Sequence, residues 1–404
     1  MPTLPCELLD HIVDILHHSQ FLSRTPLRKC CLVSKSWVPR TRRHLFAEID
    51  FQTAKSLKLW KKSFPDPSTS PARYVKVLSI GGPGVVEAAD GEAGGWIGGF
   101  SRVVHLKISG KNPHTRGWRV AFVVLRGFSP VLKSLDVCFV AYQPSMLFDL
   151  VLSFPLLEDL FLALCTHPSV RYGGYSDGPP AITQPSNLPA FSGSLVLALM
   201  DGMGPIVQRF LPLPGGVYFR KLTLMWWQQE DIPMMMALVE KCSHTLESLD
   251  IAGDPSGVPI GHLLPQGCDS LLFLADPRLA LFDLSKATRL GDVIFRPGSL
   301  KIKWITSAVR IVTHKHRDLR QIWIDVGCRL TCSPSGEDIK QTIGEGTVEQ
   351  WLNLDRTLVN LWESLSIRTN VIWTRGRSNG VVADHIGSLL PAMTKRGMVT
   401  INMI

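Results

Sequence analysis

One short apolar pattern recurs along most of this chain and constrains its fold more than any other feature. Each copy consists of an apolar residue, two variable residues, a second apolar residue, one variable residue and a third apolar residue. The second and third apolar positions alternate with other residues, as in a strand that is buried on one face. The copies begin at Val75, Val103, Leu132, Leu157, Phe219, Leu246, Leu290 and Leu319.

The spacing of these copies indicates a repeat architecture. Neighbouring copies often start 25 to 29 residues apart, which is within the range of leucine-rich repeats. A single strand-plus-helix unit cannot bury its own apolar face, so such units stack on one another. We therefore predict an α/β fold in which residues 74–404 form an irregular leucine-rich-repeat-like solenoid with a C-terminal cap. A compact α/β domain with a parallel sheet shares the same alternation and remains the alternative.

The repeats are irregular in places. Residues 162–219 lose the register, although 195–199 could form one more strand. Towards the C-terminus, apolar residues at helical spacing predict a helix over 347–366, and a strand is expected at 371–373. We expect residues 387–404 to form a helix and a tail that pack on this last repeat.

The residues before the repeats have a different, helical pattern. Apolar residues between Leu8 and Leu16 recur at helical spacing. Thr25-Pro26 combines a hydroxyl N-cap with a proline at the first helical position, and Ser34 can cap a third helix that runs to about Leu45. Three short helices make a poor core by themselves. This segment is therefore predicted to complete itself on a partner or on the following domain; an ordinary helical cap is the alternative.

The N-terminal sequence resembles the F-box, both in its motifs and in the spacing of its apolar residues. The resemblance is carried by Leu4-Pro5-x-Glu7-Leu8-Leu9-x-x-Ile12-x-x-x-Leu16 and by Leu27-x-x-Cys30-Cys31-Leu32-Val33-Ser34-Lys35-Ser36-Trp37. The following WVPRTRRHLF looks like F-box proteins of mushroom-forming fungi. The resemblance implies an F-box over residues 1–50. We expect a helix end and linker over 51–73, because residues 62–73 are rich in proline and serine, and the repeat domain beyond.

This resemblance implies a function in ubiquitin ligation. F-box modules dock on the Skp adaptor of Skp–cullin–F-box ubiquitin ligases, and the rest of such a chain usually holds the substrate. By this analogy the chain is a non-catalytic receptor that brings a protein target to an enzyme elsewhere in the assembly. The residues that face the adaptor, or pack directly beneath it, would be Leu4, Pro5, Leu8, Leu9, Ile12, Leu32, Val33 and Trp37.

The polar strand positions are the candidates for holding a target. They lie between the buried positions and would line the concave side of a solenoid. Their charges have mixed signs, whereas a nucleic-acid groove is mostly positive with interleaved aromatic residues. A protein or peptide target is therefore favoured over nucleic acid. The target-binding candidates are Lys107, Lys133, Asp136, Phe161, Arg220, Asp250, Arg320 and Trp323.

No set of residues in the sequence predicts an enzyme, a metal site or a cofactor. Residues 174–178 match G-x-S-x-G, but Pro179-Pro180 follows where a nucleophile elbow needs a helix. The glycine-rich segments 81–84 and 94–99 match neither a dinucleotide-binding motif nor a P-loop. The nine cysteines are scattered without zinc-ligand spacing, so we expect reduced thiols. A hydrolase acting through Ser176 is thus the weakest of the alternatives.

Charge and hydropathy suggest where the protein acts. The net charge is +9, and the basic residues are dispersed, with the densest runs at 40–44, 58–62 and 314–317. Because the charge is dispersed, a basic nucleic-acid-binding protein is a minor alternative. A second alternative is an F-box scaffold that binds the adaptor without ubiquitin transfer. We see no N-terminal signal segment and no apolar run long enough to cross a bilayer. We expect a soluble protein of the cytoplasm, the nucleus or both, with no membrane partner.

Overall fold

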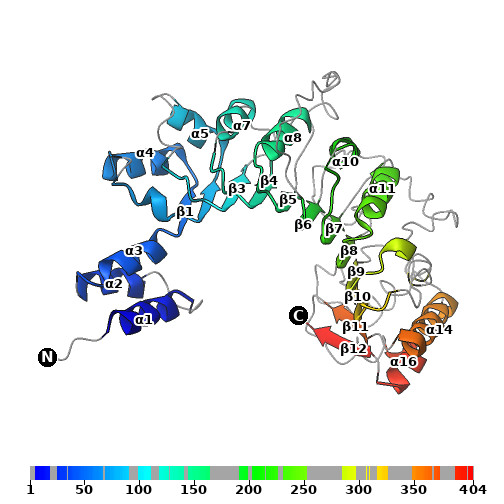
Figure 1. Cartoon of the computed structure of the whole chain (residues 1–404). Coiled ribbons are helices and arrows are strands. Elements are labelled where there is room, and N and C mark those ends of the chain that lie inside the picture. The colour runs from blue at the N-terminus through cyan, green and yellow to red at the C-terminus, as the bar shows by residue number, and fades with distance from the viewer. Residues whose placement is uncertain are drawn as a thin grey trace, which may run out of the picture. The chain divides into compact units, whose positions relative to one another are not determined.

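The computed structural model of the chain shows helices and parallel strands in alternation (Figure 1). It falls into two compact units, Met1–Ala190 and Phe191–Ile404, and we describe each by itself. The structure describes residues 5–18, 25–33, 35–66, 69–90, 99–110, 118–126, 128–140, 144–163, 191–198, 203–213, 215–225, 231–252, 284–296, 306, 309, 316–325, 348–365, 368–373, 387–397 and 399–403.

The first unit begins with three helices, as predicted. They are α1 (Cys6–His18), α2 (Thr25–Val33) and α3 (Val38–Leu45). Their shared interior contains Val13, Leu27, Cys30 and Thr41, all of which are buried. Helix α3 starts at Val38, with Trp37 as its N-cap and no side-chain cap bond, whereas the sequence suggested a cap at Ser34, which lies outside the described residues.

A parallel sheet follows in the same unit. Its strands are β1 (Glu48–Phe51), β2 (Val77–Ile80), β3 (His105–Ser109), β4 (Ser134–Cys138) and β5 (Asp159–Ala163). Each strand pairs with the next one along the chain. The sheet is covered on one face by helices that connect the strands (Figure 1): α4 (Ala54–Ser63), α5 (Pro83–Asp90), α7 (Trp118–Leu125) and α8 (Pro144–Leu152). A short 3₁₀ helix, η1 (Pro71–Tyr74), precedes β2.

The recurring apolar pattern accounts for how this sheet is buried. In β2, β3, β4 and β5 the second and third apolar residues of each copy are at most 1 % exposed. The residues between them are half-buried or exposed. The first apolar residue of each copy, such as Val75 or Val103, lies just before its strand and is also buried. Apolar residues with this spacing therefore place one face of every strand against the helices.

Strand β1 and helix α4 differ from the sequence-based boundaries. Phe46-x-x-Ile49-x-Phe51 has the repeat pattern, but we assigned it to the end of the helical module. Helix α4 then lies within the predicted helix end and linker of 51–73, and it is closed at its N-terminus by a capping box between Thr53 and Ser56. The range 51–73, predicted as a helix end and linker, therefore contains the last residue of β1, the helix α4 and most of η1.

An aromatic cluster joins the three helices to this first strand-and-helix unit. The ring of Phe46, at the C-cap of α3, lies 5.9 Å from that of Trp60 and 6.0 Å from that of Phe64. Trp60 also contacts Phe51 and Phe100, with ring centroids 5.8 and 6.1 Å apart. Aromatic pairs at these separations stabilise a packing arrangement beyond their buried area. The N-terminal helices are thus packed onto the first sheet.

The second unit repeats the same mixed α/β arrangement. Its strands are β6 (Ser194–Ala198), β7 (Lys221–Met225), β8 (Ser248–Ala252), β9 (Asp292–Arg296), β10 (Gln321–Asp325), β11 (Arg368–Trp373) and β12 (Val399–Met403). They are parallel and pair in chain order. Its helical elements are α10 (Met203–Phe210), α11 (Ile232–Cys242), η4 (Leu284–Lys286), α14 (Val348–Leu365) and α16 (Pro391–Lys395).

Most sequence-based expectations for the second unit are confirmed. The extra strand expected at 195–199 is β6, the helix expected over 347–366 is α14, and the strand expected at 371–373 is the C-terminal half of β11. Residues 387–404 were expected to form only a helix and a tail, but they also contain β12. The boundary between the two compact units lies after residue 190, inside the range 74–404 that we predicted as the repeat domain. The predicted mixed α/β class is confirmed for both units.

Two buried carboxylates hold helix ends in the second unit. Asp231 is 3 % exposed and accepts a hydrogen bond from the backbone N–H of Gly204, at 2.6 Å. Asp355, on α14, is 2 % exposed and accepts bonds from the N–H groups of Ala392 and Met393, at 2.9 and 3.0 Å. Backbone N–H groups at a helix start have no partner within the helix. Each aspartate therefore satisfies such donors on a neighbouring element.

The glycine-rich segment 81–84 has a packing role where the structure describes it. A Cβ on Gly81 would lie 2.7 Å from the Cα of Gln52 and 2.9 Å from its carbonyl oxygen. No side chain fits so close to backbone atoms, so glycine is needed where these two segments approach each other. The G-x-S-x-G segment at 174–178 and most of the segment 94–99 lie outside the described residues.

Candidate partner-binding surfaces

Helix α1 exposes large apolar side chains on its outer side. Leu8, Ile12 and Ile15 are 50, 38 and 55 % exposed, and their spacing of four and three residues places them on one helical face. On the other side of the helix Val13 is fully buried. The helix is therefore apolar on both sides, but the described part of the fold covers only one of them.

Helix α2 is exposed in the same way. Leu32 and Val33 are 86 and 67 % exposed, whereas Leu27 and Cys30 are buried in the module. Helices α1 and α2 contact each other. We call Leu8, Ile12, Ile15, Leu32 and Val33 together the N-terminal apolar surface. Single exposed apolar residues are ordinary, but several on two neighbouring helices are typical of an interaction site.

Half of the eight predicted adaptor-facing residues lie on this surface. Leu8, Ile12, Leu32 and Val33 belong to it, and Pro5 is exposed at the start of α1. Leu9 and Trp37 are half-buried. Leu4 lies outside the described residues. Ile15 was not among the candidates, although its position three residues after Ile12 is a signal that could have found it.

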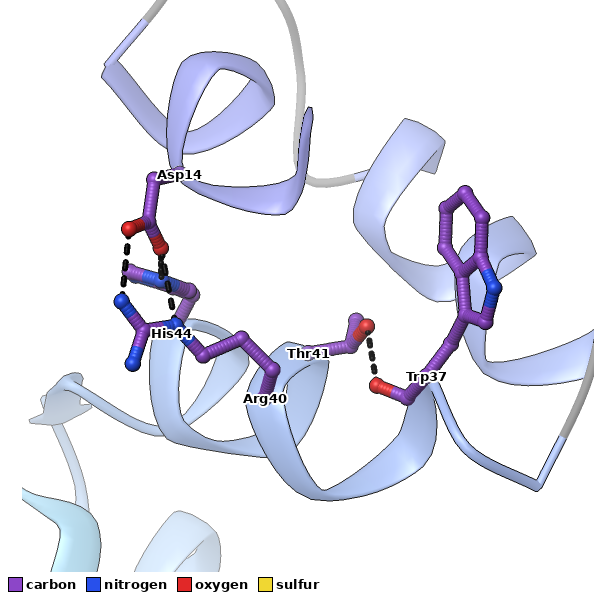
Figure 2. A network of polar contacts seen from close by, with 5 residues as sticks. All are labelled: Asp14, Trp37, Arg40, Thr41 and His44. Carbon is purple, nitrogen blue, oxygen red and sulfur yellow. Dashed lines mark hydrogen bonds and ion pairs between the residues drawn. The ribbon is translucent and has the colours of Figure 1, made fainter. Parts of the chain in front are cut away.

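A cluster of charged side chains fixes α1 against α3 (Figure 2). Arg40 Nε donates to Asp14 Oδ1 at 2.9 Å, and Arg40 Nη2 donates to Asp14 Oδ2 at 2.6 Å. His44 Nε2 lies 2.6 Å from Asp14 Oδ1. Arg40 and His44 are one turn apart on α3, so both side chains reach the same carboxylate. The hydrogen bonds from Arg40, more than those with His44, lower the pKa of Asp14 to about 2, although partial burial acts in the opposite direction.

This cluster and the buried Val13 together hold one side of α1 against the other helices. Asp14 follows Val13, so the same turn of the helix provides both the buried contact and the bidentate pair. The hydroxyl of Thr41 donates to the carbonyl of Trp37 at 2.7 Å, and in Figure 2 the Trp37 indole lies away from the Asp14 cluster. Sequence analysis did not identify Asp14, because its partners are 26 and 30 residues away.

In the first unit, four target-binding candidates lie on or beside the sheet face opposite the helices. The strand register places Lys107 beside Asp136 and Asp136 beside Phe161. Asp136 Oδ2 lies 2.8 Å from His105 Nε2, and Lys133, just before β4, forms a 2.8 Å ion pair with Glu158. The Lys133–Glu158 pair is well exposed and contributes little to stability. These candidates therefore form a solvated surface of mixed charge.

In the second unit the four candidates differ in exposure. Arg220 and Arg320 are exposed, and Arg220 Nε donates to the carbonyl of Ser192 at 2.9 Å. Trp323 is half-buried and pairs in register with Ile294 and Asn370. Asp250 was expected to face solvent, and this is wrong, because its side chain is only 6 % exposed among neighbouring strands. It is therefore a poor candidate for target contact.

Burial disfavours the reactive form of three thiols, those of Cys30, Cys138 and Cys242. Cys30, Cys31, Cys138 and Cys242 are free. Burial raises the pKa of Cys138 to about 11 and that of Cys242 to about 12, and it also raises the pKa of Cys30. Because the thiolate is the reactive and metal-binding form, these environments disfavour both roles. No group of three potential metal ligands occurs among the described residues.

Comparisons with known proteins assign no family to the chain. No family model matches the sequence, and no curated protein matches it either. Within the described residues, no helix has both the length and the apolar character needed to cross a membrane.

Proposed function

We propose that the chain is a substrate receptor of a Skp–cullin–F-box ubiquitin ligase. In this proposal the three N-terminal helices dock on a Skp-type adaptor, and the repeat-like body holds a protein target. The chain itself catalyses no step; it places the target near an enzyme of the assembly, so that an intermolecular transfer becomes effectively local.

The observation that carries the proposal is the N-terminal apolar surface. Its five side chains are between 38 and 86 % exposed, and full burial of one such side chain is worth about 1.5–3 kcal/mol. The Asp14–Arg40 pair holds the surface in one orientation before any partner arrives. A preorganised surface binds more tightly because less freedom is lost on association.

The arrangement of the strands supports the second half of the proposal. Within each unit every strand pairs with its neighbour in the chain, without the reversal of strand order found in doubly wound sheets. This order, with helices on one face in the first unit, is what a leucine-rich-repeat-like body requires. The mixed charges of Lys107, Asp136 and Lys133 on the opposite side suit a protein target better than nucleic acid.

The test is binding of a purified Skp-type adaptor to the full chain. Leu8→Ala combined with Leu32→Ala should raise the Kd about 30-fold or more, because two apolar contacts of about 1 kcal/mol or more each are lost. The matched control is Leu59→Ala with Val123→Ala, at positions that are 64 and 55 % exposed on α4 and α7. This pair should leave the Kd unchanged.

The outcomes separate the alternatives. Equal binding by the Leu8/Leu32 variant and the wild-type chain would argue strongly against the assigned surface. Pro5→Ala with Leu9→Ala should also weaken binding, but the half-buried Leu9 makes that variant less specific. Recovery of adaptor without cullin from cells would favour a scaffold that binds the adaptor without ubiquitin transfer.

A further inference from the structure

Three successive helices of the first unit are strongly basic. Helices α2, α3 and α4 contain no aspartate or glutamate. They contain nine arginines and lysines, of which Arg40 is paired with Asp14. These nine residues are Arg28, Lys29, Arg40, Arg42, Arg43, Lys55, Lys58, Lys61 and Lys62. The sequence suggested dispersed charge, but α2 packs on α3, and Phe46 at the end of α3 packs on Trp60 of α4.

Part of this charge lies directly beside the N-terminal apolar surface. Arg28 and Lys29 are exposed on α2, one helical turn before Leu32 and Val33 respectively. Each cationic side chain therefore shares a helical face with an exposed apolar side chain. On α1 the acidic residues are Glu7, which is exposed, and Asp10 and Asp14, which are half-buried, with Asp14 paired to Arg40. Positive charge thus predominates beside the apolar residues of α2.

We propose that the partner covering the N-terminal apolar surface is recognised through an acidic protein surface, which Arg28 and Lys29 contact and which the basic helices attract. This inference rests on the proposed function only in taking that partner to be the adaptor. A protein is favoured over nucleic acid, because the exposed side chains next to the cations are the aliphatic Leu32 and Val33. Single-stranded nucleic-acid sites instead interleave cations with aromatic residues on which bases stack.

The physical effect is on the rate of encounter. Charges of one sign on one side of a protein raise association rates by about 10- to 1000-fold, and added salt removes the gain. The Debye length is about 8 Å at physiological ionic strength. Arg28 and Lys29, within one turn of the contact, act at both low and physiological salt. Lys55, Lys58 and Lys62, exposed on α4, contribute mainly at low salt.

The experiment measures association and dissociation rates of the full chain with the purified adaptor at about 50 mM and about 500 mM salt. Arg28→Glu with Lys29→Glu should lower the association rate at least about 10-fold at low salt, and the difference should nearly vanish at high salt. Lys241→Glu with Lys395→Glu changes the net charge equally, at exposed positions of α11 and α16. This control should slow association far less.

Equal slowing of association by the two variants would show that only net charge matters and would overturn the inference. An unchanged association rate in the Arg28/Lys29 variant would also overturn it.

If the wild-type chain does not bind the adaptor at any salt concentration, the proposed function fails. A second measurement then tests the inference separately, with fluorescent poly-L-glutamate and a DNA duplex of similar charge. We expect poly-L-glutamate to bind and the Arg28/Lys29 variant to lose most of that binding. No binding of poly-L-glutamate, or a strong preference for DNA, would overturn the inference.

Discussion

Replacing Asp14 by asparagine tests whether one carboxylate holds α1 against α3. Asparagine keeps the size of the side chain and one acceptor oxygen but removes the charge that Arg40 and His44 contact. The Arg40 guanidinium would lose its bidentate partner, while the apolar contacts of Val13 would remain. We expect α1 to open more often without global unfolding of the chain.

The size of the effect follows from the pKa of Asp14. The decrease from 3.8 to about 2 corresponds to about 2.4 kcal/mol, at 1.36 kcal/mol per pKa unit. The side chains of Asp14 and Arg40 are 29 and 32 % exposed, so solvent screens part of this interaction. We therefore expect a loss of about 1 kcal/mol in the local stability of α1.

Hydrogen exchange measures this local opening. A loss of about 1 kcal/mol should speed exchange of the α1 amides about fivefold, while α14, in the second unit, should keep its wild-type rates. A double-mutant cycle with Arg40→Gln should return a coupling energy of the same size. Unchanged exchange of the α1 amides in the Asp14→Asn variant would refute the conclusion that the Asp14–Arg40 pair holds α1 against α3.

The contribution of the Asp14–Arg40 pair to the stability of α1 depends on pH. Because the pKa of Asp14 is lower in the folded chain than in the unfolded chain, the unfolded state binds more protons between the two values. The contribution of Asp14 is fully present above about pH 4 and is lost as the pH falls towards about 2. In the Asp14→Asn variant, α1 exchange should lose this dependence.

Two further predictions concern contacts inside each unit. Asp355→Ala should lower the free energy of unfolding by about 2 kcal/mol or more, because two N–H groups of α16 lose their acceptor. Thermal unfolding measures this loss, with Arg356→Ala, at an exposed position, as the control. Equal melting temperatures for the two variants would contradict the prediction. Gly81→Ala should destabilise the first unit, because its Cβ would lie 2.7 Å from a backbone atom of Gln52, whereas Gly84→Ala, with no atom within 4 Å, should be tolerated. Denaturant unfolding distinguishes the two, and a stable Gly81→Ala chain would mean that the two segments need not approach so closely.

The strands were predictable because their signal is local. Leu106 and Ile108, or Leu222 and Leu224, are two residues apart, and a strand places such residues on one face whatever the rest of the fold does. The same signal was present at Phe46–Phe51, but the preceding helical pattern led us to assign those residues to the N-terminal module. The apolar side of α1 was visible for a similar reason, since helical spacing by itself shows that the apolar arc is wide.

The amino-acid sequence by itself determined most of the strand positions, the three N-terminal helices and the excess of apolar residues on the first of them, because each depends on spacing within a few residues. Only the tertiary structure decided which apolar residues of α1 remain exposed, that Asp14 meets Arg40 and His44, that Asp250 is buried, and that the basic helices lie together. These properties depend on contacts between residues far apart in the chain. No local pattern specifies such contacts, because they form only when the helices and strands pack.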